Sequence, residues 1–177
     1  YFDVIENAIP GPGACGGMYT ANTMSSAIEM MGLSLTYNST IPAGSPDKIT
    51  EMGRLGKAIR LALEKDLKPM DILTKTSFEN AIALVTVLGG STNAVLHLLA
   101  IARTAGIDLN LEDFQRVSDR TPLLADLKPS GKYVMEDLHS IGGVPGVMKL
   151  MLGENLIDGN ALTVTGQTVG EILDNVE

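Results

Sequence analysis

The residue with the clearest chemical potential is Cys15, the only cysteine among the 177 residues. It lies in Gly11-Pro12-Gly13-Ala14-Cys15-Gly16-Gly17, where glycines let the backbone come close to a bulky group. N–H groups at the start of a following helix would also stabilise a thiolate. Both features suit a cysteine that holds a metal or an iron–sulfur cluster, with further ligands supplied from elsewhere. A packing cysteine, and a nucleophile activated by His97 or His139, are the alternatives.

Three other groups of residues have spacings that could support a site. Gly11-x-Gly13-x-x-Gly16 matches the dinucleotide fingerprint by letter, but Glu29, at the distance of its acidic residue, lies inside a predicted helix rather than at a strand end. Gly89-Gly90-Ser91-Thr92-Asn93 predicts a helix break with a hydroxyl cap, or a helix N-terminus that faces a carboxylate. Glu136-Asp137-Leu138-His139 could contribute to a metal site but is more typical of a solvated helix end.

Helices are the main elements that must position these residues. Apolar side chains recur at three- and four-residue steps from Met18 to Met31, which predicts a buried helical face. Ser45-Pro46 is a good helix start, with Ser as the cap and Pro at the first position. The buried face of this second helix is expected to comprise Ile49, Met52, Leu55, Ile59, Ala62 and Leu63.

The rest of the chain alternates further helices with glycine- and proline-rich turns. A helix that starts near Thr76 is apolar on nearly all sides and is expected to be deeply buried. At least one of Gly89 and Gly90, where this helix breaks, is expected to have a positive φ or a very close backbone neighbour. Other helices are predicted at 94–105, 111–117 and 146–152 and after the capping box Thr168-x-x-Glu171, and strands at 33–37 and 162–165. The pattern predicts one helix-rich α/β unit.

Composition excludes several classes of protein. Apolar residues make up 45% of the chain, which is enough for a core and argues against wholesale disorder. Thirteen Lys and Arg against 21 Asp and Glu give a formal charge of −8 without a basic run, so nucleic-acid and membrane-surface roles are disfavoured. A single cysteine excludes an internal disulfide and favours a reducing compartment.

Four stretches together resemble a known enzyme family. They are Gly11–Met24, Val87–His97, Asp119–Leu127 and Tyr133–Val147. The chain is similar over essentially its whole length to the family of dihydroxy-acid, sugar-acid and phosphogluconate dehydratases. Within that family, Met-Tyr-Thr-Ala-Asn-Thr-Met after the cysteine is closer to the members that serve branched-chain amino-acid synthesis.

The resemblance implies an activity and its cofactors. The activity is loss of water from a 2,3-dihydroxy acid, which gives a 2-oxo acid on the way to valine, isoleucine and leucine. It implies a [2Fe–2S] or [4Fe–4S] cluster held by three cysteines, of which Cys15 is one, with an open iron that acts as Lewis acid. It also implies Mg²⁺, whose ligands lie elsewhere in the family's sequence. A sugar-acid dehydratase, and a non-catalytic binding or assembly protein on the same scaffold, are the alternatives.

The resemblance also assigns the chain a place in a longer protein. Residues 1–177 correspond to the central part of the family's N-terminal α/β domain, without the C-terminal barrel-like domain that carries the serine base. We therefore expect no catalytic residue within this segment and no activity from it alone. The family further implies a homodimer, a small-molecule substrate and an intracellular site, either the cytoplasm or the matrix of a mitochondrion or plastid.

Overall fold

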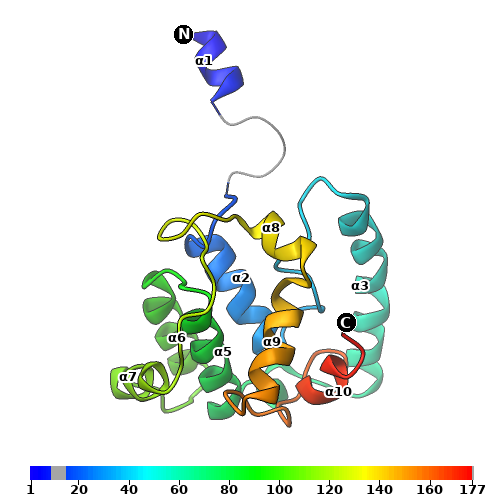
Figure 1. The fold of residues 1–177 in the computed structure, drawn as a ribbon. Helices are drawn as coiled ribbons and strands as arrows, with labels where there is room; N and C mark the ends of the chain where they lie inside the picture. The colour runs from blue at the N-terminus through cyan, green and yellow to red at the C-terminus, as the bar shows by residue number, and fades with distance from the viewer. Residues whose placement is uncertain (9–14, 177) are drawn as a thin grey trace.

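The computed structural model describes residues 1–8 and 15–176, and their regular elements are helices (Figure 1). In chain order these are α1 (Phe2–Asn7), α2 (Thr20–Met30), α3 (Pro46–Glu64), α4 (Pro69–Ile72), α5 (Lys75–Val87), α6 (Asn93–Thr104), α7 (Leu111–Asp119), α8 (Met135–Ser140), α9 (Gly143–Gly153) and α10 (Val169–Leu173). None of them combines the length and apolarity that a membrane span needs.

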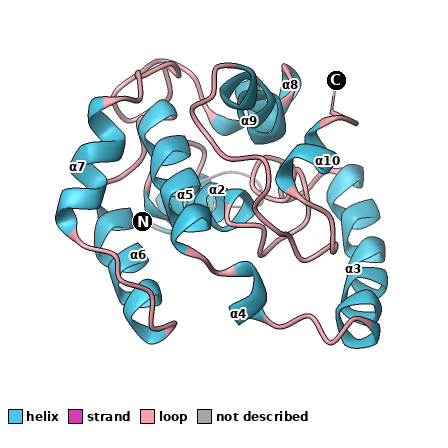
Figure 2. Ribbon diagram, turned by 90° about the horizontal axis from the view of Figure 1, so that it is seen from below, coloured by secondary structure: helices cyan, strands magenta, loops and turns pink. Residues whose placement is uncertain are grey.

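Helix α5 is the centre of the fold, as its apolar sequence predicts. None of its 13 residues is exposed, and Phe78, Ala83 and Leu84 are completely buried. Helix α2 packs along α5 and contributes Met30 and Ala27 to the same core, while α6 and α7 pack against other sides of α5. Helices α8 and α9 form a second group that shares this core, with α10 packed on α9 (Figure 2).

Local signals at helix ends are confirmed by the structure. The side chains of Ser45, Asn110 and Thr168 each accept a backbone N–H three residues on, as expected for N-caps. Helices α5 and α6 are separate, and the φ of +63° at Gly89 confirms the predicted break. At Gly90 the reason for glycine is space, because an added Cβ would lie 2.8 Å from the Thr23 side chain.

The two predicted strands are wrong. Residues 33–37 form turns, bounded by Gly32 at φ +81° and Tyr37 at φ +72°. Residues 162–165 enter a tight turn in which the Thr163 N–H donates to the Gln167 carbonyl, which leaves one isolated bridge between Leu162 and Thr168. The helix-rich character is confirmed, and β-structure within the described ranges amounts to this bridge and another between Leu127 and Tyr133.

The expected burial of the apolar face of α3 is also wrong. Exposed fractions are 68% for Ile49, 56% for Met52, 44% for Leu55, 62% for Ile59 and 77% for Leu63, while Ala62 is half-buried. The single buried residue of α3 is Glu51, which is not part of this apolar face. Helix α3 lies at the edge of the molecule in both views (Figures 1 and 2), and the exposed fractions show that the described residues leave its apolar side chains uncovered.

Candidate functional site

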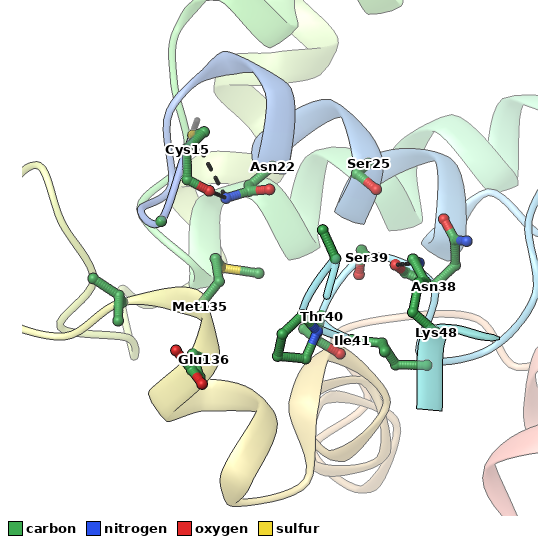
Figure 3. Close-up of a pocket in the computed structure, with 14 residues that line it drawn as sticks. Cys15, Asn22, Ser25, Asn38, Ser39, Thr40, Ile41, Lys48, Met135 and Glu136 are labelled. Carbon is green, nitrogen blue, oxygen red and sulfur yellow. Dashed lines mark hydrogen bonds between the residues drawn. The ribbon is translucent and has the colours of Figure 1, made fainter. Parts of the chain in front are cut away.

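Cys15 borders a cavity of about 430 Å³ that three segments of the chain enclose (Figure 3). The first segment is the turn before α2 together with the first turns of that helix. The second is the loop between α2 and α3, and the third is the start of α8. The lining residues are Cys15, Gly16, Asn22, Ser25, Asn38, Ser39, Thr40, Ile41, Pro42, Ala43, Lys48, Val134, Met135 and Glu136.

The side chain of Asn22 holds the cysteine turn in place. Its Nδ2 donates to the carbonyl oxygens of Cys15 at 3.0 Å and Gly17 at 2.7 Å, and lies 3.6 Å from the Cys15 Sγ. The half-buried cysteine precedes the first residue of α2, Thr20, by five positions. The group that approaches the sulfur is therefore the side-chain amide of Asn22, in the first turn of α2. The sequence had instead suggested backbone N–H groups at the start of the helix.

Two backbone hydrogen bonds join the turn that contains Cys15 to the segment 128–135. The Met18 N–H donates to the Lys128 carbonyl at 2.6 Å, and the Met135 N–H donates to the Gly16 carbonyl at 2.7 Å. An added Cβ at Gly17 would lie 2.8 Å from the Lys128 carbonyl oxygen, so this glycine is required by a close backbone approach. The glycines at 11 and 13 lie outside the described residues.

The wall formed by residues 37–40 depends on the buried carboxylate of Glu29 in α2. Its two oxygens accept the N–H groups of Tyr37 at 2.7 Å and Ser39 at 2.8 Å. Glu29 is only 4% exposed, and burial raises the pKa of this carboxyl from 4.5 to about 7, against the effect of the hydrogen bonds. The carboxylate of Glu29 thus fixes the backbone of residues 37–39 by accepting two of its N–H groups.

Lys48 and Glu51 of α3 complete this wall. The Lys48 Nζ donates to Glu51 at 2.7 Å and to the Asn38 carbonyl at 2.9 Å, and Glu51 also accepts from the Asn38 Nδ2 at 2.6 Å. Ser39 beside them is buried, and its Oγ has no partner among the described residues. These contacts tie the first turns of α3 to the loop that lines the cavity.

The glycine-serine-threonine-asparagine segment docks on the start of α2. The Ser91 N–H donates to the Thr23 Oγ at 3.0 Å, and the Asn93 Nδ2 donates to the Thr20 Oγ at 2.7 Å. The Ser91 Oγ accepts the Asn93 N–H at 3.2 Å, whereas Thr92, the N-cap residue of α6, makes no side-chain cap hydrogen bond. These groups are used in joining α6 to α2, which favours a structural role over an anion site.

Of the acidic and histidine candidates, only Glu136 reaches the cavity. Asp137 accepts the Val134 N–H at 2.8 Å and so caps α8, in agreement with the solvated-helix interpretation. His139 and His97 are not among the residues that line the cavity, and neither is hydrogen-bonded to Cys15 within the described part of the chain. The structure therefore gives the nucleophile alternative no base.

The residues around Cys15 can be compared with the ligands that an iron–sulfur cluster requires. Cys15 borders the cavity, and the Asn22 side-chain amide lies 3.6 Å from its sulfur, an approach that is common for cluster thiolates. Residues 1–8 and 15–176 contain no group of three or more His, Cys, Asp or Glu side chains that could hold a metal. The residues present thus fit one thiolate ligand of a cluster and supply none of the others.

Comparison with known proteins gives the family directly. Residues 1–172 match the model of the dihydroxy-acid/6-phosphogluconate dehydratase N-terminal region. The chain belongs to this dehydratase family.

Individual proteins that are similar to the chain are named as dihydroxy-acid dehydratases. The chain is 63% identical over 173 residues to a dihydroxy-acid dehydratase of Flavobacterium psychrophilum, with 98% of the chain and 31% of the relative covered. It is 59% identical over 175 residues to a mitochondrial dihydroxy-acid dehydratase of Aspergillus fumigatus, with 99% of the chain and 29% of the relative covered. The chain therefore spans about 30% of the length of these relatives.

Most residues of the cavity wall were not predicted from the sequence. Asn22 lies within the motif that carries the family resemblance, so its polar side chain on a predicted helix near Cys15 was a usable signal. Glu29 also carried a signal, because a carboxylate on an apolar helix face must find donors when it is buried. Ser39 and Lys48 gave none, since their position depends on how the loop folds around Glu29.

Proposed function

We propose that this chain forms part of an enzyme that dehydrates a 2,3-dihydroxy acid to a 2-oxo acid in the synthesis of branched-chain amino acids. The observation that carries the proposal is the cavity bordered by Cys15, in a chain 63% identical to a dihydroxy-acid dehydratase. The reaction removes the C2 proton and the C3 hydroxyl as water, and the resulting enol tautomerises to the 2-oxo acid.

Cys15 is the residue to which we assign a role at the cofactor. Its thiolate would supply one of three cysteine ligands to an iron–sulfur cluster, [2Fe–2S] or [4Fe–4S]. Asn22 would orient this ligand and donate a hydrogen bond to its sulfur, and the close approach at Gly17 would fix the turn. When bound, the cluster would supply a Lewis acid for the departing hydroxyl, and Mg²⁺ would help to hold the substrate carboxylate and hydroxyl.

Other properties belong to the same proposal. The chain would be the central part of an N-terminal α/β domain, whose sheet, remaining cofactor ligands and catalytic groups lie in other parts of a longer protein. The chain alone would be inactive. The complete protein would be an intracellular homodimer in the cytoplasm or in an organellar matrix.

A sugar-acid dehydratase is the second candidate, because the matched family model spans both dihydroxy-acid and 6-phosphogluconate enzymes. The names of the similar relatives favour the first candidate. A panel that contains one branched 2,3-dihydroxy acid and several linear sugar acids would separate the two. Preference for a sugar acid would reverse the choice, and failure with every substrate would favour the non-catalytic alternative.

A chimaera provides the test of Cys15. This chain replaces the aligned segment of the Flavobacterium psychrophilum enzyme, and iron content, visible absorption and turnover are measured with Cys15 or with Cys15→Ser. The serine variant is expected to lose most of its iron and its turnover, because a hydroxyl is a much poorer soft ligand than a thiolate. Ser118→Ala, at an exposed position on α7, is the matched control. A Cys15→Ser chimaera with full iron and turnover would remove the ligand assignment.

A further inference from the structure

The cavity beside Cys15 has walls of two kinds. The polar part lies on the loop between α2 and α3 and comprises Asn38, Ser39 and Thr40. The apolar part combines the end of this loop with the start of α8 and comprises Ile41, Pro42, Val134 and Met135. The volume of about 430 Å³ falls within the roughly 300–1,000 Å³ that is usual for small-molecule sites. Such a cavity suits a small molecule that has one polar and one apolar end.

The apolar part of the wall is held by the folded chain itself, unlike the exposed face of α3. Met135 is 5% exposed and Ile41 is 8% exposed, whereas the apolar side chains of α3 are between 44% and 77% exposed. A surface that receives a segment of protein leaves a large contiguous apolar area uncovered. Here only small areas of the two side chains border the hollow. The apolar wall therefore fits a small group, such as an alkyl group of a few carbons, better than a segment of polypeptide.

The apolar wall begins directly beside Cys15. The Met135 N–H donates to the Gly16 carbonyl at 2.7 Å, and a Cβ added to Gly16 would lie 3.7 Å from the Val134 Cγ1. Figure 3 shows the Met135 side chain between the turn that carries Cys15 and the loop that carries Ile41. An apolar group in contact with this wall would thus lie next to the turn that holds the thiol.

The order of groups in a branched 2,3-dihydroxy acid matches this arrangement. The alkyl group and the departing hydroxyl are bonded to the same carbon, C3, while the carboxylate and the remaining hydroxyl are on C1 and C2. The alkyl group therefore lies at the reacting end of the molecule, on the side of Cys15. A linear sugar acid carries a hydroxymethyl or polyol group at C3 instead. Its hydroxyl would lose hydrogen bonds to water against Met135 and Ile41, whose side chains offer no oxygen or nitrogen atom.

We propose that Ile41, Val134 and Met135 form the subsite for the branched alkyl group of the substrate and determine the preference for branched dihydroxy acids over sugar acids. These residues act by contact with the alkyl group, so they determine specificity and take no part in the chemistry. The inference rests on the proposed function, because it places the reaction beside Cys15. It adds a reason for substrate choice within a family whose matched model covers both dihydroxy-acid and 6-phosphogluconate enzymes.

Binding of acids that cannot lose water tests the subsite directly. The probes are 2-hydroxy-3-methylbutanoate and 2,4-dihydroxybutanoate, which both lack the C3 hydroxyl, and isothermal titration calorimetry gives their dissociation constants for the chimaera. The branched acid is expected to bind about tenfold more tightly, and Met135→Gln and Ile41→Thr should each remove most of this preference. Met70→Gln and Ile49→Thr, at side chains 54% and 68% exposed, are the matched controls and should leave the preference unchanged.

Turnover by the chimaera provides a second measurement of the same preference. The ratio of kcat/KM for a branched 2,3-dihydroxy acid to that for a linear sugar acid should fall by about tenfold in Met135→Gln. Met135→Leu keeps an apolar side chain of similar volume and should retain the preference. Thermal melts identify a variant that fails to fold. Val134→Thr then replaces it, because threonine has the shape of valine and is a favoured residue at the N-cap position of α8.

The two measurements distinguish failure of the subsite from failure of the proposed function. If the binding preference and the kcat/KM ratio both stay unchanged in folded variants, the subsite assignment is wrong while the proposed function stands. A chimaera that dehydrates neither class of acid contradicts the proposed function, and the calorimetric preference still decides whether Ile41 and Met135 contact the alkyl group.

Discussion

The buried carboxyl of Glu29 makes the stability of the fold depend on pH in an unusual direction. Burial raises its pKa from 4.5 to about 7, opposed by hydrogen bonding from Ser39 and Tyr37 and helped by the nearby charge of Glu51. Glu29→Gln removes the titration but keeps the size of the side chain and one oxygen acceptor. The glutamine therefore resembles the protonated glutamic acid.

The sign and size of the effect follow from linkage between protonation and folding. Because the pKa is higher in the folded protein, the stabilising contribution of the protonated group is fully present below pH 4.5 and is lost as the pH rises through 7. A rise in pKa from 4.5 to about 7, at roughly 1.4 kcal/mol for each pH unit, gives a loss of about 3 kcal/mol. The glutamine variant is spared this loss.

Urea unfolding followed by circular dichroism measures the difference. The free energy of unfolding of the unmodified chain, relative to that of Glu29→Gln, should fall by about 3 kcal/mol between pH 4.5 and pH values above 7. At about pH 8 the variant should be the more stable protein. Glu154→Gln, at an exposed position, should show no such difference.

One result would refute this reasoning. If Glu29→Gln is less stable than the unmodified chain at about pH 8, and the difference grows as the pH rises, the carboxylate form is the favoured one in the folded protein. The N–H groups of Tyr37 and Ser39 would then outweigh the cost of burying the charge.

Two further substitutions test the packing and the charges elsewhere. Gly90→Ala should destabilise the chain by about 1–3 kcal/mol, because its Cβ would lie 2.8 Å from the Thr23 side chain, whereas Gly153→Ala meets open space and should be neutral or slightly stabilising in thermal melts. The Lys75 ammonium holds the pKa of Asp113 down, from 3.8 to about 2, so the stability it contributes is present above pH 3.8 and is lost as the pH falls through 2. Asp113→Asn should abolish this part of the acid denaturation curve, and an unchanged curve would contradict the assignment.

Features that depend on a few neighbouring residues could be predicted from the sequence. Ser45, Asn110 and Thr168 cap their helices because the hydroxyl or amide oxygen and the N–H it accepts are three residues apart. The break at Gly89 and the burial of α5 follow in the same way from local composition. The family resemblance likewise rested on four short stretches of sequence, one of which contains Cys15.

Features that depend on distant segments could not be predicted in this way. The apolar period of α3 identifies one face of the helix but not what covers it, and this face is exposed. Alternation at 33–37 suggested a strand, yet within residues 1–8 and 15–176 no strand pairs with it, and the carboxylate of Glu29 holds the adjoining loop instead. Lys48 reaches the cavity only because that loop does.

The absence of exposed residues in α5 has a consequence for how the chain tolerates mutation. A helix with one solvent-exposed face accepts polar substitutions at every third or fourth position. Its tolerance to substitution therefore varies along the sequence with a period near 3.6 residues. Helix α5 has no exposed residue between Lys75 and Val87, so a scan of all substitutions should find a nearly uniform block of intolerance there. Helix α7, with only Asp113 and Val117 buried, should show the period instead. Lineages that diverge in this protein are thus expected to accumulate their differences around α5 and not within it.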